Sequence, residues 1–223
     1  MRLHSLVPLA FAALPIALSA QTPAAKFVDS ARTEIEAASM ARDTARLSAA
    51  VILLDRALVA FPGDPYLQHY RGYAGYRQVV ELMRSGRMNA APPLLDRATA
   101  DLEASSTKLQ WPETYALLST LTAFRLMLDP SQGMTLGPRS GELMAQASQL
   151  APNNPRVLYM QALAAFNTPP EYGGSVDGAR TLIMRSLEEF KKEKPAPLAP
   201  AWGLGEAAAF EKQIHKPVVE PSR

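Results

Sequence analysis

Two series of helical hydrophobic patterns alternate along the chain. The first series has four members, each with two apolar residues, a variable position, Arg or Gln, and then Ala or Ser: LLDRAL from Leu53, LLDRAT from Leu94, LMAQAS from Leu143 and LIMRSL from Leu182. Apolar residues such as Leu54, Leu58 and Phe61 recur at the spacing that places them on one face of a helix. The four starts lie 41, 49 and 39 residues apart. The pattern therefore predicts degenerate helical repeats with loops of unequal length.

The second series consists of segments that open with proline: PYLQHYRGYAGY from Pro65, PETYALLSTLTAF from Pro112, PRVLYMQALAAF from Pro155 and PAWGLGEAAAF from Pro200. Proline suits the first turn of a helix, where its missing N–H has no partner to lose. Small residues follow near the middle of each segment and an aromatic residue about one turn later, so a second helix can approach closely there. Trp111 and Trp202 stand at the start of two of these helices, and we expect them to pack between repeats.

The two series interleave, which predicts an all-α fold: an αα-hairpin repeat solenoid of about four degenerate helix pairs with long helices. Turn signals separate the periodic runs at residues 62–65 (PGDP), residues 152–155 (PNNP) and Ser85-Gly86. β-Branched residues are sparse and no long run alternates with period two, so no strand is predicted.

The order of these motifs resembles the tetratricopeptide repeat family. In that family helix A carries a small residue at its middle, a Gly often lies in the turn between helices A and B, and helix B ends in Ala-x3-Phe-Pro. Gly72, Gly86 and the run from Ala57 to Pro62 match these positions, and a second end, from Ala147 to Pro152, lacks the aromatic residue. The period here is near 45 residues, longer than the roughly 34 of the family. The resemblance implies a concave face lined by the A helices, as in an exported bacterial repeat protein.

The ends of the chain differ from the repeat region, which we place at residues 21–216. Residues 1–20 have the pattern of a secretion signal, with Arg2 followed by an uncharged apolar run and small residues up to Ala20. A buried first helix is the alternative interpretation. Cleavage near Ala20 predicts a periplasmic or secreted protein without a transmembrane segment in the mature chain. A proline-rich spacer leads to a last helix from about Ala201 to Lys216, and we expect residues 217–223 to form a disordered tail.

Composition removes several function classes. The chain has no cysteine, which excludes a disulfide framework and thiolate chemistry. Its formal net charge of +2 comes without a cluster of Lys and Arg, so we expect no nucleic acid partner. The histidines lack metal-ligand spacing, and neither a nucleophile elbow nor a phosphate-binding loop occurs. We therefore expect no enzyme activity, no metal site and no cofactor.

The candidate binding residues gather on the A helix that begins at Pro65. They are Tyr66, His69, Tyr70, Tyr73, Tyr76 and Arg77, to which Arg125 on the following A helix adds a cation. Tyrosine suits a groove because its ring buries apolar area while its hydroxyl keeps a hydrogen bond. The same rings could equally pack between helices as core, and the sequence leaves both interpretations open.

A second candidate is the loop at Tyr172, Gly173 and Gly174, where two glycines allow a sharp turn and Ser175 can cap the helix that follows. The stretch from Pro169 resembles a motif of exported bacterial repeat proteins and the helical accessory subunit of some secondary transporters. A turn with a helix cap is one interpretation of it, and a ligand-contacting loop is the other.

These observations support two functional hypotheses. The first is a non-catalytic scaffold or adaptor that holds a protein or peptide partner on its curved surface. The second is a small-ligand-binding accessory protein of a transport system, in which the rings around Tyr70 and Tyr73 enclose an apolar pocket.

Overall fold

The computed structural model describes residues 23–215, all of whose regular elements are helical. The α-helices are α1 (Ala25–Ala41), α2 (Thr44–Ala60), α3 (Pro65–Arg84), α4 (Pro92–Ser106), α5 (Pro112–Leu128), α6 (Gly133–Leu150), α7 (Pro155–Asn167), α8 (Val176–Lys192) and α9 (Leu204–Ile214). Short 3-10 turns occur at Met88–Ala90, Pro130–Gln132 and Pro170–Tyr172. The predicted secretion signal (residues 1–20) and the predicted tail (residues 217–223) lie outside the described residues.

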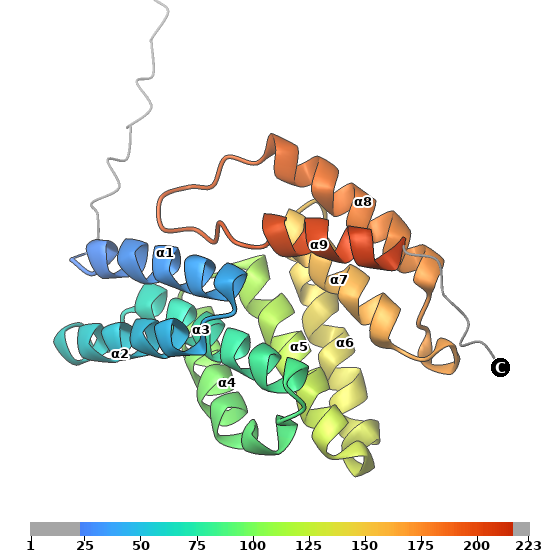
Figure 1. Ribbon diagram of the computed structural model, residues 1–223, viewed down its shortest axis with the longest axis horizontal. Helices are drawn as coiled ribbons and strands as arrows, with labels where there is room; N and C mark the ends of the chain where they lie inside the picture. Colours follow the sequence, from blue (N-terminus) through green and yellow to red (C-terminus); the bar gives the residue numbers. More distant parts are fainter. Residues whose placement is uncertain (1–22, 216–223) are drawn as a thin grey trace, which may run out of the picture.

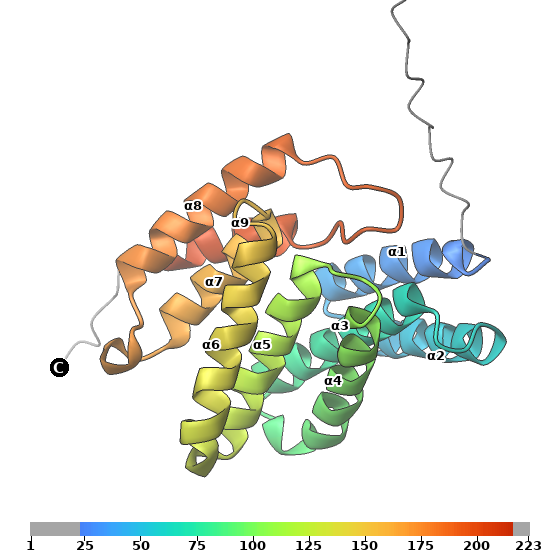
Figure 2. The same cartoon turned by 180° about the vertical axis from the view of Figure 1, so that it is seen from behind.

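Consecutive helices form four antiparallel pairs that stack one after another across the molecule (Figure 1). The pairs are α1 with α2, α3 with α4, α5 with α6, and α7 with α8. The helices α3, α5 and α7 also pack on the pair before them. Figure 2 shows the same succession from behind, with α4 and α6 on the outer side. The predicted all-α repeat fold with four helix pairs is confirmed.

Three of the four predicted A helices begin at the proline that the sequence marks. Asp64 caps α3 by accepting hydrogen bonds from the backbone N–H groups of Tyr66 and Leu67, both at 3.0 Å. Asn154 caps α7 in the same way. Such caps satisfy backbone donors that a helix leaves free at its start, which explains why PGDP and PNNP end one helix and open the next.

The small residues in the middle of α3 let α4 approach as predicted. A Cβ atom added at Gly72 would lie 2.6 Å from Cγ of Leu102, and one added at Gly75 would lie 2.8 Å from Cβ of Ala98. Glycine is therefore required at both positions by close packing, because a side chain would push α4 away from α3.

The fourth predicted A helix was placed wrongly at its start. Pro200 and Trp202 do not open a helix, because the chain remains irregular until Leu204, where α9 begins. Gly203, with φ of +102°, sets the left-handed turn from which α9 starts. Residues 193–203, which we call the strap, form a long connection from the end of α8 across the molecule to α9 (Figure 1).

Candidate functional site

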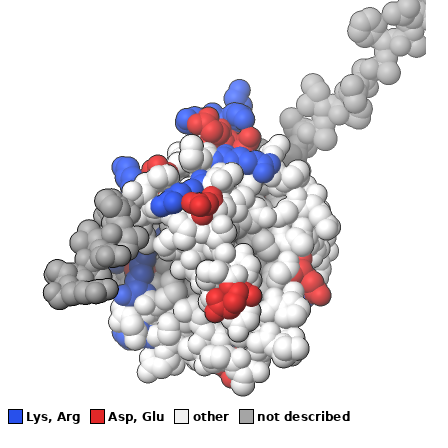
Figure 3. Space-filling model, turned by 90° about the vertical axis from the view of Figure 1, so that its right-hand side faces the viewer, with Lys and Arg blue, Asp and Glu red and all other residues white. Residues whose placement is uncertain are grey.

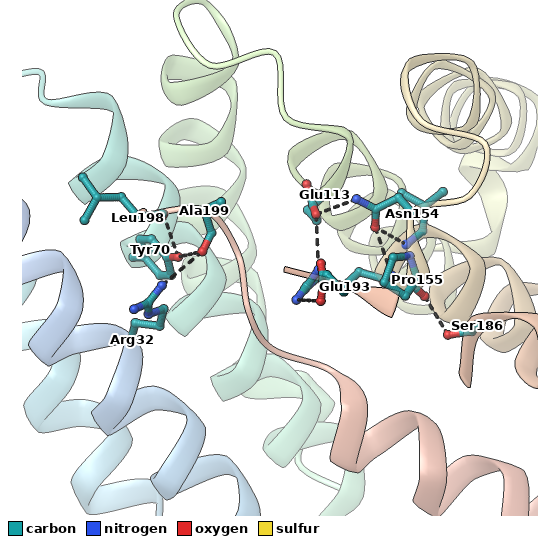
Figure 4. Close-up of polar contacts among 11 residues, drawn as sticks. Arg32, Tyr70, Glu113, Asn154, Pro155, Ser186, Glu193, Leu198 and Ala199 are labelled. Atoms are coloured by element: carbon teal, nitrogen blue, oxygen red, sulfur yellow. Dashed lines mark hydrogen bonds and ion pairs between the residues drawn. The ribbon is translucent and has the colours of Figure 1, made fainter. Parts of the chain in front are cut away.

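The strap covers the face of the solenoid to which α1, α3, α5 and α7 contribute. Figure 4 shows its ribbon between Arg32 and Tyr70 on one side and Glu113 on the other. Tyr70 and Tyr73, the centre of the predicted tyrosine face, are fully buried beneath the C-terminal part of the chain. In this conformation the tyrosine face is covered, and it offers no open groove to a partner.

Four aromatic rings form a nearly parallel column under the strap. The indole of Trp202 stacks on Tyr73, with 4.8 Å between ring centroids and 15° between planes. Tyr73 continues to Tyr76 at 6.3 Å, and Tyr76 to Phe124 at 6.2 Å. Offset stacking of this kind adds stability beyond the apolar area that each ring buries. Trp202 is the one ring of the column that the strap supplies.

The helices hold the strap by donating hydrogen bonds to its oxygen atoms. The hydroxyl of Tyr70 lies 3.0 Å from the carbonyl oxygens of both Leu198 and Ala199. Nη1 of Arg32 donates to the Ala199 carbonyl at 3.3 Å. At the other end, Arg156 donates through both terminal nitrogens to the carboxylate of Glu193, with Nη2 at 2.9 Å. Every one of these contacts has its donor on a helix and its acceptor on the strap.

Arg156 occupies a buried polar cluster at the junction of α5, α7 and the strap. Its side chain is fully buried, and besides Glu193 it lies 3.6 Å from the carboxylate of Glu113. Burial raises the pKa of Glu113, although the amide of Asn154 donates a hydrogen bond to it at 2.7 Å and the Arg156 charge opposes the shift. The guanidinium also faces the rings of Phe190 and Trp202, 5.5 and 5.7 Å from their centroids. A planar cation between aromatic rings is a favourable arrangement in a desolvated site.

A second set of buried charges joins α3 to α9. Nη1 of Arg77 lies 2.8 Å from Oε1 of Glu206, and both side chains are almost fully buried. Glu36 is close by and accepts a hydrogen bond from the Tyr73 hydroxyl at 2.7 Å. Burial, together with the neighbouring Glu206 charge, raises the pKa of Glu36. Two carboxylates, those of Glu36 and Glu206, share this region with one guanidinium. The positive charge of Arg77 therefore compensates the negative charge where α9 contacts α3.

Several buried polar atoms at this site lack a hydrogen-bond partner. Among residues 23–215 they include Nε of Arg77, Nε of Arg156, Nε1 of Trp202 and Oε1 of Glu206, whose contact with Arg77 is an ion pair but not a hydrogen bond. Unsatisfied buried polar atoms are costly, and a native structure holds few of them. The contact between the helices and the C-terminal part of the chain is therefore polar and incompletely satisfied.

His69 belongs to the packing between α3 and α5. Its ring is fully buried, with Nδ1 2.9 Å from Oγ1 of Thr114 and the edge-on ring of Trp111 at 4.8 Å. Burial lowers the pKa of His69 to about 3, so the imidazole is neutral at physiological pH. The half-buried Tyr66 packs against the same indole, and Trp111 lies between repeats as predicted.

The other predicted binding residues lie apart from this site. Arg125 pairs with Asp96 on α4 at 2.7 Å instead of joining the tyrosine face. Tyr172 is 79% exposed, and Gly173 has φ of +91°. In the same loop the predicted cap is present, with the Ser175 hydroxyl accepting from the N–H of Gly178 at 3.0 Å. Whether these residues or the tyrosine face bind a ligand stays a prediction.

The sequence hypothesis missed the polar residues that surround the tyrosines. Arg156, Glu113, Glu193 and Glu36 come from three different helices and the strap, so no local spacing connects them. The sequence feature that could have pointed to this site is the composition of the strap. In it a tryptophan follows three prolines, after the charged end of α8.

The outer surface has few charged side chains on one face, and it also has a small recess. Figure 3 shows the side at the right of Figure 1 as a broad face with few charged residues, whose cations are interspersed with carboxylates at the upper and left edges. A recess between α2, α3 and α4, where Arg71 lies beside Gly75 and Leu94, has a volume of only about 20 Å³. That is room for a water molecule and too little for a ligand.

Two absences hold for the part of the chain that the structure describes. No group of three or more His, Cys, Asp and Glu residues is placed to hold a metal ion. No helix within residues 23–215 is long and apolar enough to span a bilayer.

Comparison with known proteins places the fold. No family model and no curated protein sequence matches this chain, so membership of the tetratricopeptide repeat family is not shown. Among solved structures the chain is similar to the HusA haemophore from Porphyromonas gingivalis, with a TM-score of 0.64 and 20% sequence identity. The match covers 90% of this chain and 98% of that chain. The two proteins share an all-helical, repeat-like fold over nearly their whole lengths.

Proposed function

We propose that this protein is an exported binding protein for a small, planar and largely apolar ligand, and that haem is the first candidate. The observation that carries the proposal is the match in fold, over nearly the full length of both chains, to a haemophore. Fold alone does not determine function, so the proposal needs support from the residues of this chain. The aromatic column and the buried arginines beside it supply chemistry suited to a flat ligand with acidic groups.

The coverage of the A-helix face favours a small ligand over a peptide partner. An extended peptide needs an accessible groove along several repeats, and the strap occupies that position on the tyrosine face. The adaptor hypothesis thereby loses the surface on which it depended. We place the mature binding domain at residues 21–216, after removal of residues 1–20 by the export machinery. Both boundaries remain part of the proposal.

The test is a spectroscopic titration of the mature protein, beginning at Gln21, with haemin and with metal-free protoporphyrin. We expect a saturable change in the porphyrin absorption band at one ligand per chain, and quenching of tryptophan fluorescence. Equal binding of the two compounds would show that the ring and its carboxylates are recognised without the iron. Absence of saturable binding of either compound would contradict the proposal. Capture of a defined protein by crosslinking in envelope extract would then favour the adaptor.

A further inference from the structure

The contacts of the strap resemble those of a bound ligand more than those of a structural connection. Its only backbone–backbone hydrogen bond among residues 194–202, all of which lie in the described part of the chain, joins Ala199 N–H to the Ala196 carbonyl. Proline occupies three of its positions and removes backbone donors. Residues 194–202 therefore make no backbone–backbone hydrogen bond to a helix, and they can move away from the helices without breaking one.

The strap is also strained in its backbone, and buried nitrogen atoms at its contact with the helices lack hydrogen-bond acceptors. Leu198 has φ of +64°, a left-handed conformation that a branched side chain rarely adopts. Nε1 of the buried Trp202 has no acceptor, and Nε of Arg156 has no acceptor either, within residues 23–215. Three favourable contacts offset these costs: the burial of the Leu198 side chain, the burial of the Trp202 side chain, and the Arg156–Glu193 ion pair. A ligand that supplies a larger ring and a carboxylate could replace all three favourable contacts.

The groups with which the strap contacts the helices define the chemistry of such a ligand. It supplies an aromatic plane to the face of Tyr73 and a carboxylate to Arg156, both from the same short segment. It also supplies carbonyl oxygens to the Tyr70 hydroxyl and the Arg32 guanidinium. When the strap moves away, the Tyr70 hydroxyl and the Tyr73 ring face lose their strap partners, whereas Arg32 keeps Asp29 and Arg156 keeps Glu113 beside it. A flat aromatic molecule with oxygen acceptors at its edge matches the contacts that are lost.

We infer that the strap occupies the ligand site of this protein as an internal mimic, and that a planar aromatic carboxylate displaces it. The ligand stacks on Tyr73 where Trp202 now lies and pairs with Arg156 where Glu193 now lies. This inference rests on the proposed function, and it adds the place of binding, the chemical class of the ligand and a competition between ligand and strap. Glu113 and Glu36 stay behind on their helices, which limits the site to a ligand whose negative charge lies beside Arg156.

The experiment fixes the strap reversibly. The chain has no cysteine, so the double variant Arg32→Cys/Ala199→Cys provides one thiol on α1 and one on the strap. These positions are joined in the native protein by a hydrogen bond that spans one arginine side chain. A short bis-methanethiosulfonate crosslinker bridges the thiols, and a reducing agent releases them. Haemin and protoporphyrin titrations are then made on the same sample before crosslinking, after crosslinking and after reduction.

We expect crosslinking to weaken porphyrin binding by about tenfold or more and reduction to restore it, since a closed strap removes the binding-competent state. Equal affinity of the crosslinked and reduced samples would overturn the inference while leaving the proposed function in place. Absence of porphyrin binding to the wild-type chain would overturn both. The three outcomes are therefore distinguishable.

Variants of the strap give an independent readout that does not require crosslinking. Trp202→Ala removes the competing ring, and we expect porphyrin binding to become about tenfold tighter or more, because the open state becomes more populated. Weaker binding in this variant would show that Trp202 belongs to the site and would contradict the competition. Trp111→Phe, in the packing between α3 and α5, is the matched control and should leave affinity unchanged. Protoporphyrin dimethyl ester, which lacks the carboxylates, should bind about tenfold more weakly than protoporphyrin.

Discussion

The indole of Trp202 lies almost parallel to the ring of Tyr73, at 4.8 Å between centroids, although the two residues are 129 positions apart in the chain. This contact joins the C-terminal segment to the second helix pair. It turns the row of tyrosines on α3 from an exposed face into an interior. The tyrosine face of α3 is consequently part of the core of the protein in this conformation.

Trp202 should be a major contributor to stability. It is 2% exposed and packs against Tyr73 and Arg156. We expect Trp202→Ala to lower the free energy of unfolding by about 3–5 kcal/mol, the usual range for removing a large buried ring. Urea unfolding followed by circular dichroism measures the change. Trp202→Phe should cost less than half as much, because Nε1 of the indole has no hydrogen bond to lose within the described chain. Equal losses in the two variants would contradict this account.

His69 should make the protein less stable in mild acid. Its pKa is about 3 in the folded chain, whereas an unfolded histidine titrates near 6.5. As the pH falls below about 6.5, the unfolded state takes up a proton that the folded state does not, so unfolding becomes easier by about 1.4 kcal/mol per pH unit. Glu36 and Glu113 act in the opposite direction, because their raised pKa values favour proton uptake by the folded state.

A comparison with His69→Asn isolates the histidine contribution, since the two carboxyl groups are present in both proteins. We expect urea unfolding between pH 7.5 and 5.5 to show a shallower loss of stability in the variant. Parallel curves would indicate that His69 is able to protonate within the fold.

The loop between α7 and α8 should depend strongly on one glycine. A Cβ atom at Gly174 would lie 1.6 Å from the carbonyl oxygen of Thr168, a clash with backbone that no rotamer relieves. We expect Gly174→Ala to destabilise the protein by about 3 kcal/mol or more. Gly173→Ala meets no neighbouring atom within 4 Å but keeps φ of +91°, so it should cost about 1–2 kcal/mol. Gly141→Ala, at an open position in α6, should be neutral or slightly stabilising. Thermal unfolding ranks the three variants.

The sequence was sufficient for the elements whose signals are local. Pro65 and Pro155 open their helices as predicted, and the residues directly before them, Asp64 and Asn154, cap these helices. Gly72 and Gly75 stand where α4 comes close, which the small-residue pattern anticipated. In each case the residues that cause the structure are neighbours along the chain or along one helix.

The candidate site could not be derived in this way, because its decisive contacts are long-range. The Tyr70 hydroxyl meets carbonyl groups 128 and 129 residues away, and its pattern on α3 is the same for a groove as for a core. Arg156 is the second residue of an A helix, and no local pattern marks it as buried, yet it is fully buried among carboxylates and aromatic rings. Tyr70 and Arg156 are both buried because the strap runs over them. The sequence of a proline-rich connection carries little information about where that connection packs.

The Arg77–Glu206 pair provides the last prediction, since it holds α9 to α3. Arg77→Met should destabilise the protein by about 3–5 kcal/mol, because it leaves Glu206 buried beside Glu36 without a compensating charge. The double variant Arg77→Met/Glu206→Gln removes the unpaired charge, so it should recover most of that loss. Urea unfolding of wild type, both single variants and the double variant completes the cycle. Glu34→Gln, which breaks the exposed pair with Arg46, is the control and should change stability little. Additive losses in the cycle would mean that the pair contributes no coupling, and that apolar contacts such as Phe210 against Tyr159 hold α9 alone.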